Sequence, residues 1–309
     1  MMVRVFIDGA SGTTGLEIRE RLSGRADIAL LSLDEAHRRD PEARAEALNA
    51  ADVVILCLPD DAAREAVALI TNPRTRVIDA STAHRTAPDW VYGLPELSGS
   101  QASAIAGTRF VSNPGCYPTG FLLLVAPLIR AGIVPVDWPM SVNAVSGYSG
   151  GGKPMIADFT KGGEGTAFRA YALGLAHKHV PEMQLYAGLA HPPIFAPAVV
   201  ATYRGMVVEV PLPLHALPGR PTLAQVREVL GTAYGDAPAI RFGGDDAALI
   251  RVEDDAGTDR VTLHVCGNDA AGQARLIATL DNLGKGAAGA AVQNLNIMAG
   301  LDPRAGLIL

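Results

Sequence analysis

Short apolar runs alternate with helical patterns through the first part of the chain. Runs rich in β-branched residues predict four strands, at residues 3–8, 28–33, 53–58 and 76–79. Apolar residues at helical spacing between these runs predict helices at 16–22, 41–50 and 62–70. Asp60 is placed to cap the last of these helices. Strands that alternate with helices in this way indicate a doubly wound α/β domain of the Rossmann type.

The pattern changes in the rest of the chain. The apolar stretch 121–129 predicts a buried helix, and Thr222 suits the N-cap of an amphipathic helix at 223–234. Further strand-like runs lie at 140–146, 199–210, 248–252 and 260–266. This mixture indicates an α+β domain with a mostly antiparallel sheet, and 309 residues are enough for two domains.

Composition and charge narrow the function classes. The chain is 49% hydrophobic with a net charge of −6, so it offers no overall basic field for nucleic acid or a membrane surface. Its start lacks the apolar core of a signal peptide, and no apolar run approaches the ~18 residues of a membrane span. Cys57 and Cys266 lie in apolar runs typical of buried strands. Three unclustered cysteines indicate a reducing compartment, so we expect a cytoplasmic protein.

A glycine-rich turn follows the first predicted strand and leads into a helix. Its spacing is G-x-x-G-x-x-G rather than the commoner G-x-G-x-x-G. Glycines there permit a tight turn and let a diphosphate approach the N–H groups at the helix start. The alternative is a glycine turn that binds nothing. The predicted dinucleotide contacts are Gly9, Ser11, Gly12, Thr13, Thr14 and Gly15.

The end of the second predicted strand bears on the choice between NAD and NADP. An acidic residue at this point takes the ribose 2′-hydroxyl of NAD, whereas arginine accommodates the 2′-phosphate of NADP. Asp34 and Glu35 are followed by Arg38 and Arg39, so both signs of charge are present. The arginine pair favours NADP(H). The alternative is a solvated charge run at a helix start.

Two further segments carry candidate anion contacts. Arg85 lies just past the fourth predicted strand, where ligands of such folds bind, and its guanidinium would meet a phosphate or carboxylate. Lys153 ends the glycine-rich run 147–153, which we interpret as a mobile loop because glycine disfavours helix and strand interiors. The alternatives are a surface arginine and a plain linker.

The segment 112–120, Ser-Asn-Pro-Gly-Cys-Tyr-Pro-Thr-Gly, carries the clearest chemistry. Cys116 comes at or just before the start of the predicted buried helix, and Pro118 suits the first turn of that helix. The N–H groups and positive dipole end of a helix start favour an anion, so a thiol there loses its proton more readily. Cys116 is therefore a candidate nucleophile. The alternative is a small apolar residue that fills space behind a turn.

Two histidines and a carboxylate follow within residues 177–182. His177 and His179 point the same way if the segment is extended. A histidine near a thiol can shuttle its proton, and Glu182 is close enough in sequence to hold one ring in a single tautomer. No cysteine or acidic residue lies at finger-like spacing, so we expect no metal. The alternative is that the histidines have no catalytic role.

These segments resemble the short form of the N-acetyl-γ-glutamyl-phosphate reductase family over nearly the whole chain. The most specific match is the run Asn-Pro-Gly-Cys-Tyr-Pro-Thr at 113–119. One departure is the segment 79–85, where longer members carry a related Ser-Ala-Asp-Phe-Arg, so only Ser81 and Arg85 are carried over. The other matching segments are 9–15, 92–97, 147–153, 177–182, 286–289 and 292–294.

The resemblance implies a reaction and an architecture. The reaction is the NADPH-dependent reduction of N-acetyl-γ-glutamyl phosphate to N-acetylglutamate 5-semialdehyde plus phosphate, in arginine biosynthesis. The architecture is a Rossmann domain at 1–115, a catalytic and dimerisation domain at 116–284, and a C-terminal helix at 285–309 that returns to the first domain. Family members are dimers or tetramers, so a homodimer or homotetramer acting on a small acyl phosphate is expected.

The resemblance also implies residue roles. Cys116 would attack the acyl phosphate and form a thioacyl enzyme, with His179 as the acid/base partner oriented by Glu182. His177 would contact the substrate, although the sequence does not separate the roles of the two histidines. The further substrate contacts implied are Asn113, Arg85, Ser149 and Lys153. The further cofactor contacts implied are Ser81 and Asn294.

Three alternatives stay open at this point. Aspartate-semialdehyde dehydrogenase shares the fold, the thioacyl chemistry and the first glycine turn, but its cysteine motif reads Asn-Cys. A catalytically silent NADPH-binding regulator belongs to another class, and the intact set Cys116, His179 and Glu182 argues against it. The sequence also does not distinguish a related acyl phosphate, such as one derived from aminoadipate with a different amino-blocking group.

Overall fold

The chain divides into two compact units in a computed structural model that describes residues 2–34, 37, 40–160, 166–244 and 247–309. The first unit combines Met1–Pro95, Ser100–Pro114 and Ala287–Leu307. The second unit combines Glu96–Gly99, Gly115–Gly286 and Ile308–Leu309. The chain therefore passes between the units more than once, and one of these crossings lies directly before Cys116.

The first unit is built on a parallel sheet with strand order β2-β1-β3-β4-β6-β5. Its strands are β1 (Val3–Asp8), β2 (Ile28–Leu31), β3 (Val53–Leu56), β4 (Arg76–Asp79), β5 (Val91–Tyr92) and β6 (Phe110–Ser112). Every residue of β3 is buried, as expected for a parallel strand that is covered on both faces. The four strands predicted from the apolar runs are confirmed, with β2 and β3 each two residues shorter than expected.

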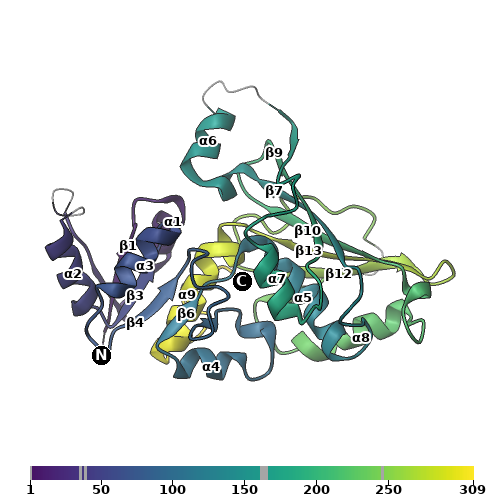
Figure 1. Cartoon of the computed structure of the whole chain (residues 1–309), viewed down its shortest axis with the longest axis horizontal. Coiled ribbons are helices and arrows are strands. Elements are labelled where there is room, and N and C mark those ends of the chain that lie inside the picture. Colours follow the sequence, from purple (N-terminus) through teal and green to yellow (C-terminus); the bar gives the residue numbers. More distant parts are fainter. Residues whose placement is uncertain (1, 35–36, 38–39, 161–165, 245–246) are drawn as a thin grey trace. The chain divides into compact units, whose positions relative to one another are not determined.

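Helices pack on both faces of this sheet (Figure 1). They are α1 (Thr13–Leu22), α2 (Pro41–Ala50), α3 (Asp60–Ala68), α4 (Gln101–Gly107) and α9 (Gly289–Ala299). One apolar cluster joins Ile18 of α1 and Val292 of α9 to Val5 of β1. A separate cluster joins Leu48 of α2 to Phe6, the next residue of β1, whose side chain points to the opposite face. The unit thus has the Rossmann-like α/β arrangement that the sequence predicts.

The second unit contains a mixed sheet with strand order β11-β12-β13-β10-β7-β9-β8. Its strands are β7 (Ser141–Gly147), β8 (Phe168–Ala170), β9 (Ile194–Val200), β10 (Met206–Leu212), β11 (Ile240–Phe242), β12 (Val261–Asn268) and β13 (Gln273–Leu280). Strands β7 and β9 pair in parallel, as do β11 and β12, whereas the other four pairs are antiparallel. The sheet is therefore mixed, where the sequence indicated a mostly antiparallel one.

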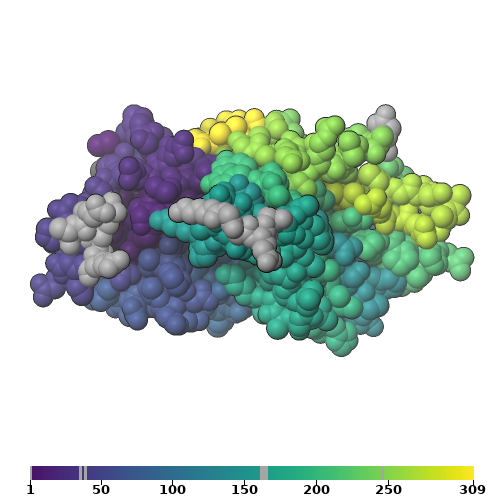
Figure 2. Space-filling model, turned by 90° about the horizontal axis from the view of Figure 1, so that it is seen from above, coloured from purple at the N-terminus to yellow at the C-terminus, as the bar shows by residue number. Residues whose placement is uncertain are grey.

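Helices α5 (Cys116–Arg130), α7 (Val180–Ala187) and α8 (Leu223–Tyr234) lie along one face of this sheet (Figure 1). Helix α5 is almost completely buried, and Gly120 lets it approach the sheet, since a Cβ there would lie 2.9 Å from Val208. Helix α6 (Gly152–Thr160) has no buried residue. The surface of this part of the chain is coloured teal in the view from above (Figure 2). The short turns are η1 (Pro95–Leu97), η2 (Tyr148–Gly151), η3 (Leu214–Ala216) and the π-helical η4 (Gly284–Ala288).

Several local predictions need correction. The run 147–153 is not a loop: Gly147 ends β7, η2 follows, and Lys153 lies in α6. Another segment of the chain holds this glycine-rich run in place: the N–H groups of Tyr148 and Ser149 donate to the carbonyls of residues 202 and 203. Residues 248–252 form no strand.

Cap and cysteine predictions had mixed outcomes. Asp60 is the first residue of α3 rather than its cap, and its carboxylate accepts from Thr82 instead. The Thr222 cap is confirmed as part of a capping box.

Cys266 lies in β12 and Cys57 directly after β3, and both are only partly buried. Within the described ranges, no helix combines the length and the apolar character that crossing a bilayer requires.

Candidate active site

Cys116 is the first residue of α5, as the sequence predicts. Gly115 precedes it in an extended conformation as the N-cap, and no side chain caps the helix there. The first N–H groups of α5 and the positive end of its dipole therefore lie beside the thiol. The helix starts here because the Thr119 hydroxyl and N–H both bond to the Gly115 carbonyl, which closes the first turn.

Glu182 connects the histidine segment to this helix start. It lies in the first turn of α7, and only 1% of its surface is exposed. Its Oε2 accepts a hydrogen bond of 3.1 Å from the N–H of Gly115, directly before Cys116. His179 is the N-cap of the same helix α7, so this bond brings the histidine segment to the start of α5.

The two histidines lie in an aromatic cluster beside Cys116. The ring of Tyr117, the next residue along α5, is 5.9 Å from the ring of His179 and 6.0 Å from that of His177. The two imidazoles are 4.6 Å apart, and Phe195 of β9 packs 5.1 Å from His177. Cysteine, histidines and glutamate, far apart in sequence, thus meet at one helix start.

A hydrogen bond distinguishes His177 from His179. The backbone N–H of His179 donates to Nδ1 of His177 at 3.1 Å, so this nitrogen acts as an acceptor and the proton of the neutral ring sits on Nε2. His177 Nε2 lies 3.5 Å from the Tyr171 hydroxyl. Protonation of His177 at Nδ1 would break its bond to the backbone, which disfavours a proton-shuttle role for this ring.

Two tyrosines that sequence reasoning did not single out complete the cluster. The Tyr171 hydroxyl donates to that of Tyr117 at 3.2 Å, and the Tyr117 hydroxyl donates to the Ala198 carbonyl at 3.3 Å. Burial raises the pKa of Tyr171 to about 12 and holds the pKa of Tyr117 well above its usual value. Both hydroxyls are therefore neutral at physiological pH. The adjacency of Tyr117 to Cys116 is the one sequence signal that pointed to this cluster.

The glycine turn between β1 and α1 has the shape of a dinucleotide cradle. Gly9 has a φ of 87°, and a Cβ there would lie 2.3 Å from the Cys57 carbonyl oxygen. A Cβ on Gly15 would lie 2.5 Å from the Gly9 carbonyl oxygen. Gly12 is the extended N-cap of α1 with no side-chain cap, and Thr13 and Thr14 begin the helix. The turn thus has tightly packed backbone on one side and a helix start that suits a diphosphate.

Asn294 belongs to a second polar group in this unit. It is fully buried in α9, and its Nδ2 donates to the Gly93 carbonyl at 2.9 Å and to Oδ1 of Asn113 at 3.1 Å. Nδ2 of Asn113 in turn donates to the Ala287 carbonyl at 3.0 Å. Oδ1 of Asn294 is buried and has no hydrogen-bond partner among the described residues. A carboxamide donor of a bound nicotinamide would satisfy this oxygen.

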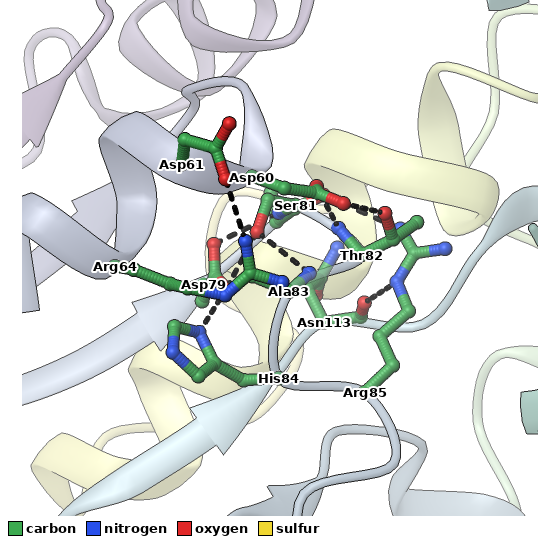
Figure 3. Close-up of polar contacts among 11 residues, drawn as sticks. Asp60, Asp61, Arg64, Asp79, Ser81, Thr82, Ala83, His84, Arg85 and Asn113 are labelled. Atoms are coloured by element: carbon green, nitrogen blue, oxygen red, sulfur yellow. Dashed lines mark hydrogen bonds and ion pairs between the residues drawn. The ribbon is translucent and has the colours of Figure 1, made fainter.

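The segment after β4 is organised by Asp79 (Figure 3). This carboxylate is fully buried and accepts from the Ser81 N–H at 2.9 Å and the Ser81 hydroxyl at 2.7 Å. Nδ1 of His84 lies 2.6 Å from the same carboxylate, and its ring stacks on Trp90 at 4.1 Å. Ser81 is therefore held by Asp79 at the carboxyl edge of the sheet, where ligands of this fold bind.

The remaining predicted contacts have varied surroundings. Arg85 is 7% exposed, and its guanidinium donates to the carbonyls of Asn113 and Ala80. Ser149 is buried in η2, and its hydroxyl accepts from Asn282 at 2.8 Å. Lys153 is exposed on α6. Arg38 and Arg39 lie outside the described residues. Across the described parts of the chain, no three histidine, cysteine or acidic side chains are grouped to hold a metal ion.

Comparisons with known sequences agree with this arrangement. Residues 116–282 match the family described as "Semialdehyde dehydrogenase, dimerisation domain", and residues 4–105 match "Semialdehyde dehydrogenase, NAD binding domain". A protein of Burkholderia lata named N-acetyl-gamma-glutamyl-phosphate reductase is 52% identical over 96% of this chain and 96% of its own length. One from Pseudomonas putida, named N-acetyl-gamma-glutamyl-phosphate reductase 2, is 51% identical over 96% of both chains.

Solved structures show the same fold at much lower identity. Aspartate semialdehyde dehydrogenase II of Vibrio cholerae, complexed with ASA, superposes with a TM-score of 0.74 at 16% identity, covering 97% of this chain and 99% of the other. Aspartate semialdehyde dehydrogenase of Candida albicans with NADP superposes with a TM-score of 0.66 at 14% identity, again over 97% and 99%. At such identities the likeness concerns the fold alone.

Proposed function

The chain belongs to the N-acetyl-gamma-glutamyl-phosphate reductase family, and on this premise we propose that it reduces N-acetyl-γ-glutamyl phosphate with NADPH. The products would be N-acetylglutamate 5-semialdehyde and phosphate, in arginine biosynthesis. The observation that carries the proposal is Cys116 at the uncapped start of α5, with Glu182 bonded to the preceding N–H and the two histidines beside it. These are the parts that acyl transfer through a cysteine requires.

In this proposal Cys116 forms a covalent intermediate. His179 takes the thiol proton, the sulfur attacks the acyl carbon, and the bond from that carbon to the phosphate oxygen breaks. His179 returns the proton to the departing phosphate, and the acyl group stays bound to the sulfur as a thioester. The first N–H groups of α5 stabilise the negative charge that develops on the acyl oxygen. Bound NADPH would supply the hydride that reduces the thioester. The C–S bond then breaks, the aldehyde leaves, and the thiolate is restored.

Within this proposal the histidines have different tasks. Because Nδ1 of His177 already accepts from the backbone, His177 would stay neutral and donate from Nε2 to the substrate. His179 would be the proton shuttle. Glu182 is proposed to hold His179 in its useful tautomer, in addition to its bond with Gly115. Asn113, Arg85, Ser149 and Lys153 are proposed as further substrate contacts.

The residues of the first unit fit NADP(H). We propose that the glycine turn with Ser11, Thr13 and Thr14 holds the diphosphate and that Asn294, with its buried carboxamide oxygen, meets the nicotinamide. Ser81 would lie along the cofactor at the carboxyl edge of the sheet. Arg38 and Arg39 would take the 2′-phosphate, a choice that rests on sequence.

We also propose the coarse organisation that the family implies. The NADP-binding domain would span 1–115, the catalytic and dimerisation domain 116–284, and the C-terminal helix 285–309 would complete the first domain. The protein would act in the cytoplasm as a homodimer or homotetramer, through the region that matches the dimerisation domain.

A substrate comparison tests the proposed function against its nearest rival. The purified enzyme is given NADP⁺, phosphate and either N-acetylglutamate semialdehyde or aspartate semialdehyde, and NADPH formation is followed by absorbance. We expect phosphate-dependent turnover with the acetylated substrate only. Turnover with aspartate semialdehyde alone would assign the aspartate-semialdehyde dehydrogenase activity. Binding of NADPH without turnover of either substrate would assign a silent regulator.

A further inference from the structure

A buried ion pair of the second unit joins Glu96, in the matching segment 92–97, to Lys285, the residue directly before the matching segment 286–289. Nζ of Lys285, in η4, lies 2.8 Å from both carboxylate oxygens of Glu96, in η1. The side chain of Lys285 is 0% exposed and that of Glu96 is 5% exposed. Desolvating two charges commonly costs as much as their attraction returns, and an apolar pair of similar volume often serves stability as well. A contribution to folding stability therefore does not explain why this ion pair is present.

The turn that carries Lys285 packs directly against the cysteine. Lys285 precedes Gly286 in η4, a π-helical turn, and such turns recur at functional sites. A Cβ on Gly286 would lie 2.8 Å from Cβ of Cys116 and 3.3 Å from its Cα. Only glycine allows this turn to approach Cys116 so closely, so the position of the turn limits where the cysteine side chain can lie.

The start of the same turn is anchored independently. The N–H of Gly286 donates to the Asp281 carbonyl at 2.9 Å. The fully buried Asp281 carboxylate accepts from the N–H groups of Gly257 at 2.6 Å and Leu283 at 2.8 Å. Asp281 thus holds the turn from the side of β13. The bond between Lys285 and Glu96 holds it from the side of η1.

We infer that Glu96 and Lys285 are positioning residues for the nucleophile: their ion pair fixes η4 so that Gly286 holds the Cys116 side chain at the start of α5. There the N–H groups and the helix dipole favour the thiolate. If the pair is removed, η4 relaxes, the cysteine side chain gains room, and the thiol spends less time where its anion is stabilised. Neither residue needs to touch the substrate for this effect.

The test removes both charges together. In the variant Glu96→Leu with Lys285→Met, the ammonium and the carboxylate are removed together and neither is left without the other, so the urea midpoint should stay near that of the wild type. The rate of Cys116 alkylation by iodoacetamide is measured across pH on the folded, full-length protein, by mass spectrometry of the cysteine peptides. We expect alkylation at neutral pH to slow by about tenfold, which corresponds to about one unit in the pH midpoint.

The other cysteines and a core variant provide the controls. Desolvation of the partly buried Cys57 thiol, together with the neighbouring carboxylates of Asp79 and Asp8, raises its pKa to about 12, so this thiol should stay unreactive across the neutral range. Cys266 in β12 reports on general accessibility. The variant Leu263→Ala truncates a buried side chain of the same sheet and should lower stability without slowing Cys116.

Two results would overturn the inference. One is a folded double variant whose Cys116 is alkylated at the wild-type rate or faster, with an unchanged pH midpoint. If the double variant does not fold, Gly286→Ala answers the question with the ion pair intact, because the added Cβ must displace the Cys116 side chain. Wild-type alkylation of Cys116 in that variant would show that the turn does not position the thiol.

The readout separates this inference from the proposed function. The inference rests on the proposed function only because it treats Cys116 as the nucleophile. Alkylation of Cys116 needs neither substrate nor NADPH, so it can be measured whatever reaction the enzyme catalyses. Slowed alkylation in the double variant, together with a wild-type enzyme that does not turn over the acetylated substrate, would leave the positioning role standing and remove the proposed reaction. A fall in kcat that parallels the slowed alkylation would support both.

Discussion

Two helix starts in this molecule have similar backbones and very different surroundings. Helices α1 and α5 each follow an extended glycine N-cap, Gly12 and Gly115, and neither has a side-chain cap. Each therefore presents backbone N–H groups and the positive end of a dipole to whatever lies in front of it. At this level the two sites offer the same electrostatics.

The difference lies in what is packed around each start. At α1 the neighbours are mainly backbone atoms. The carbonyl of Cys57 leaves no room for a Cβ on Gly9, and backbone atoms of Gly9 and Ala10 leave none for a Cβ on Gly15. At α5 the first residue is a cysteine. Glu182 accepts a hydrogen bond from the N–H directly before it, and the ring of Tyr117, the next residue, lies 5.9 Å from that of His179. A helix start framed by glycine suits an anion brought from outside, whereas one framed by titratable side chains suits an anion made on the protein itself.

The largest effect should come from Cys116→Ser. A serine alkoxide is far harder to form than a thiolate, so the covalent step should stall and turnover should fall below detection, while NADPH binding is nearly unchanged. Turnover and fluorescence titration with NADPH measure the two quantities. A serine variant that keeps about a tenth of wild-type turnover would show that the α5 start does not carry the nucleophile.

Next in size is His179→Asn, which tests what makes the α5 start reactive. A positioned acid/base group contributes about 10²–10⁴-fold in rate, so kcat should fall by that factor with little change in KM. The pH dependence of kcat should change as well, because imidazole titrates near neutrality. Steady-state kinetics across pH measure both quantities.

His177→Asn is the matched variant for this prediction. An asparagine oxygen can replace Nδ1 as acceptor of the His179 N–H, so the loop should keep its shape. We expect mainly a higher KM, because a substrate contact is lost. The reverse pattern in the two variants would exchange their roles. A loss of less than about tenfold in kcat for both would place the proton shuttle elsewhere.

The α1 start is tested by Gly15→Ala and Gly12→Ala. On Gly15 the new Cβ would lie 2.5 Å from the Gly9 carbonyl, so the turn must shift, and overpacking of this kind costs about 1–3 kcal/mol. On Gly12 the nearest atom is the Gly9 carbonyl oxygen at 3.3 Å, a tight contact that a small shift relieves, so any loss of stability should be small compared with that of Gly15→Ala. We expect both variants to bind NADPH about tenfold more weakly or worse, because a Cβ meets the diphosphate or the cradle moves.

Urea unfolding and NADPH titration separate these two glycines. A loss of stability confined to Gly15→Ala, with weakened binding in both variants, identifies the turn as a cofactor cradle. Wild-type affinity in Gly12→Ala would mean that the α1 start faces no diphosphate, and the comparison between the two helix starts would fail.

The smallest effect concerns cofactor choice. Replacing Arg38 and Arg39 by alanine should raise the KM for NADPH and leave that for NADH almost unchanged, because only NADPH carries the 2′-phosphate. Asp34 and Glu35 precede this pair and oppose part of the attraction, so we expect about a tenfold effect. Steady-state kinetics with each cofactor measure it, and equal losses for both would contradict the 2′-phosphate role.

Much of the first unit was predictable because its signals are local. Apolar runs that alternate with helical spacing placed β1 to β4 and α1 to α3, and the order of strands and helices indicated a parallel sheet. Pro118 and the apolar stretch behind it placed Cys116 at a helix start. Each of these signals lies within a few residues of the feature that it predicts.

Local signals failed where support comes from elsewhere in the chain. The run 147–153 contains too much glycine for a stable helix on its own, yet it enters η2 and the start of α6. The carbonyls of residues 202 and 203 hold η2 by accepting hydrogen bonds from the N–H groups of Tyr148 and Ser149. The apolar run 248–252 suggested a strand and is irregular. In the first segment, local propensity gave way to tertiary contacts.

The sequence by itself placed Cys116 at the start of α5, placed the start of α1 within three residues, and indicated the parallel sheet and the reactive side chains of the motifs. Only the tertiary structure decided which of these groups meet. It bonds Glu182 to an N–H 67 positions earlier in the chain, joins Tyr171 to Tyr117, and pairs Glu96 with a lysine 189 positions later. The reason is physical: backbone sterics and side-chain periodicity act between near neighbours, whereas the partner of a buried polar group is set by the whole path of the chain.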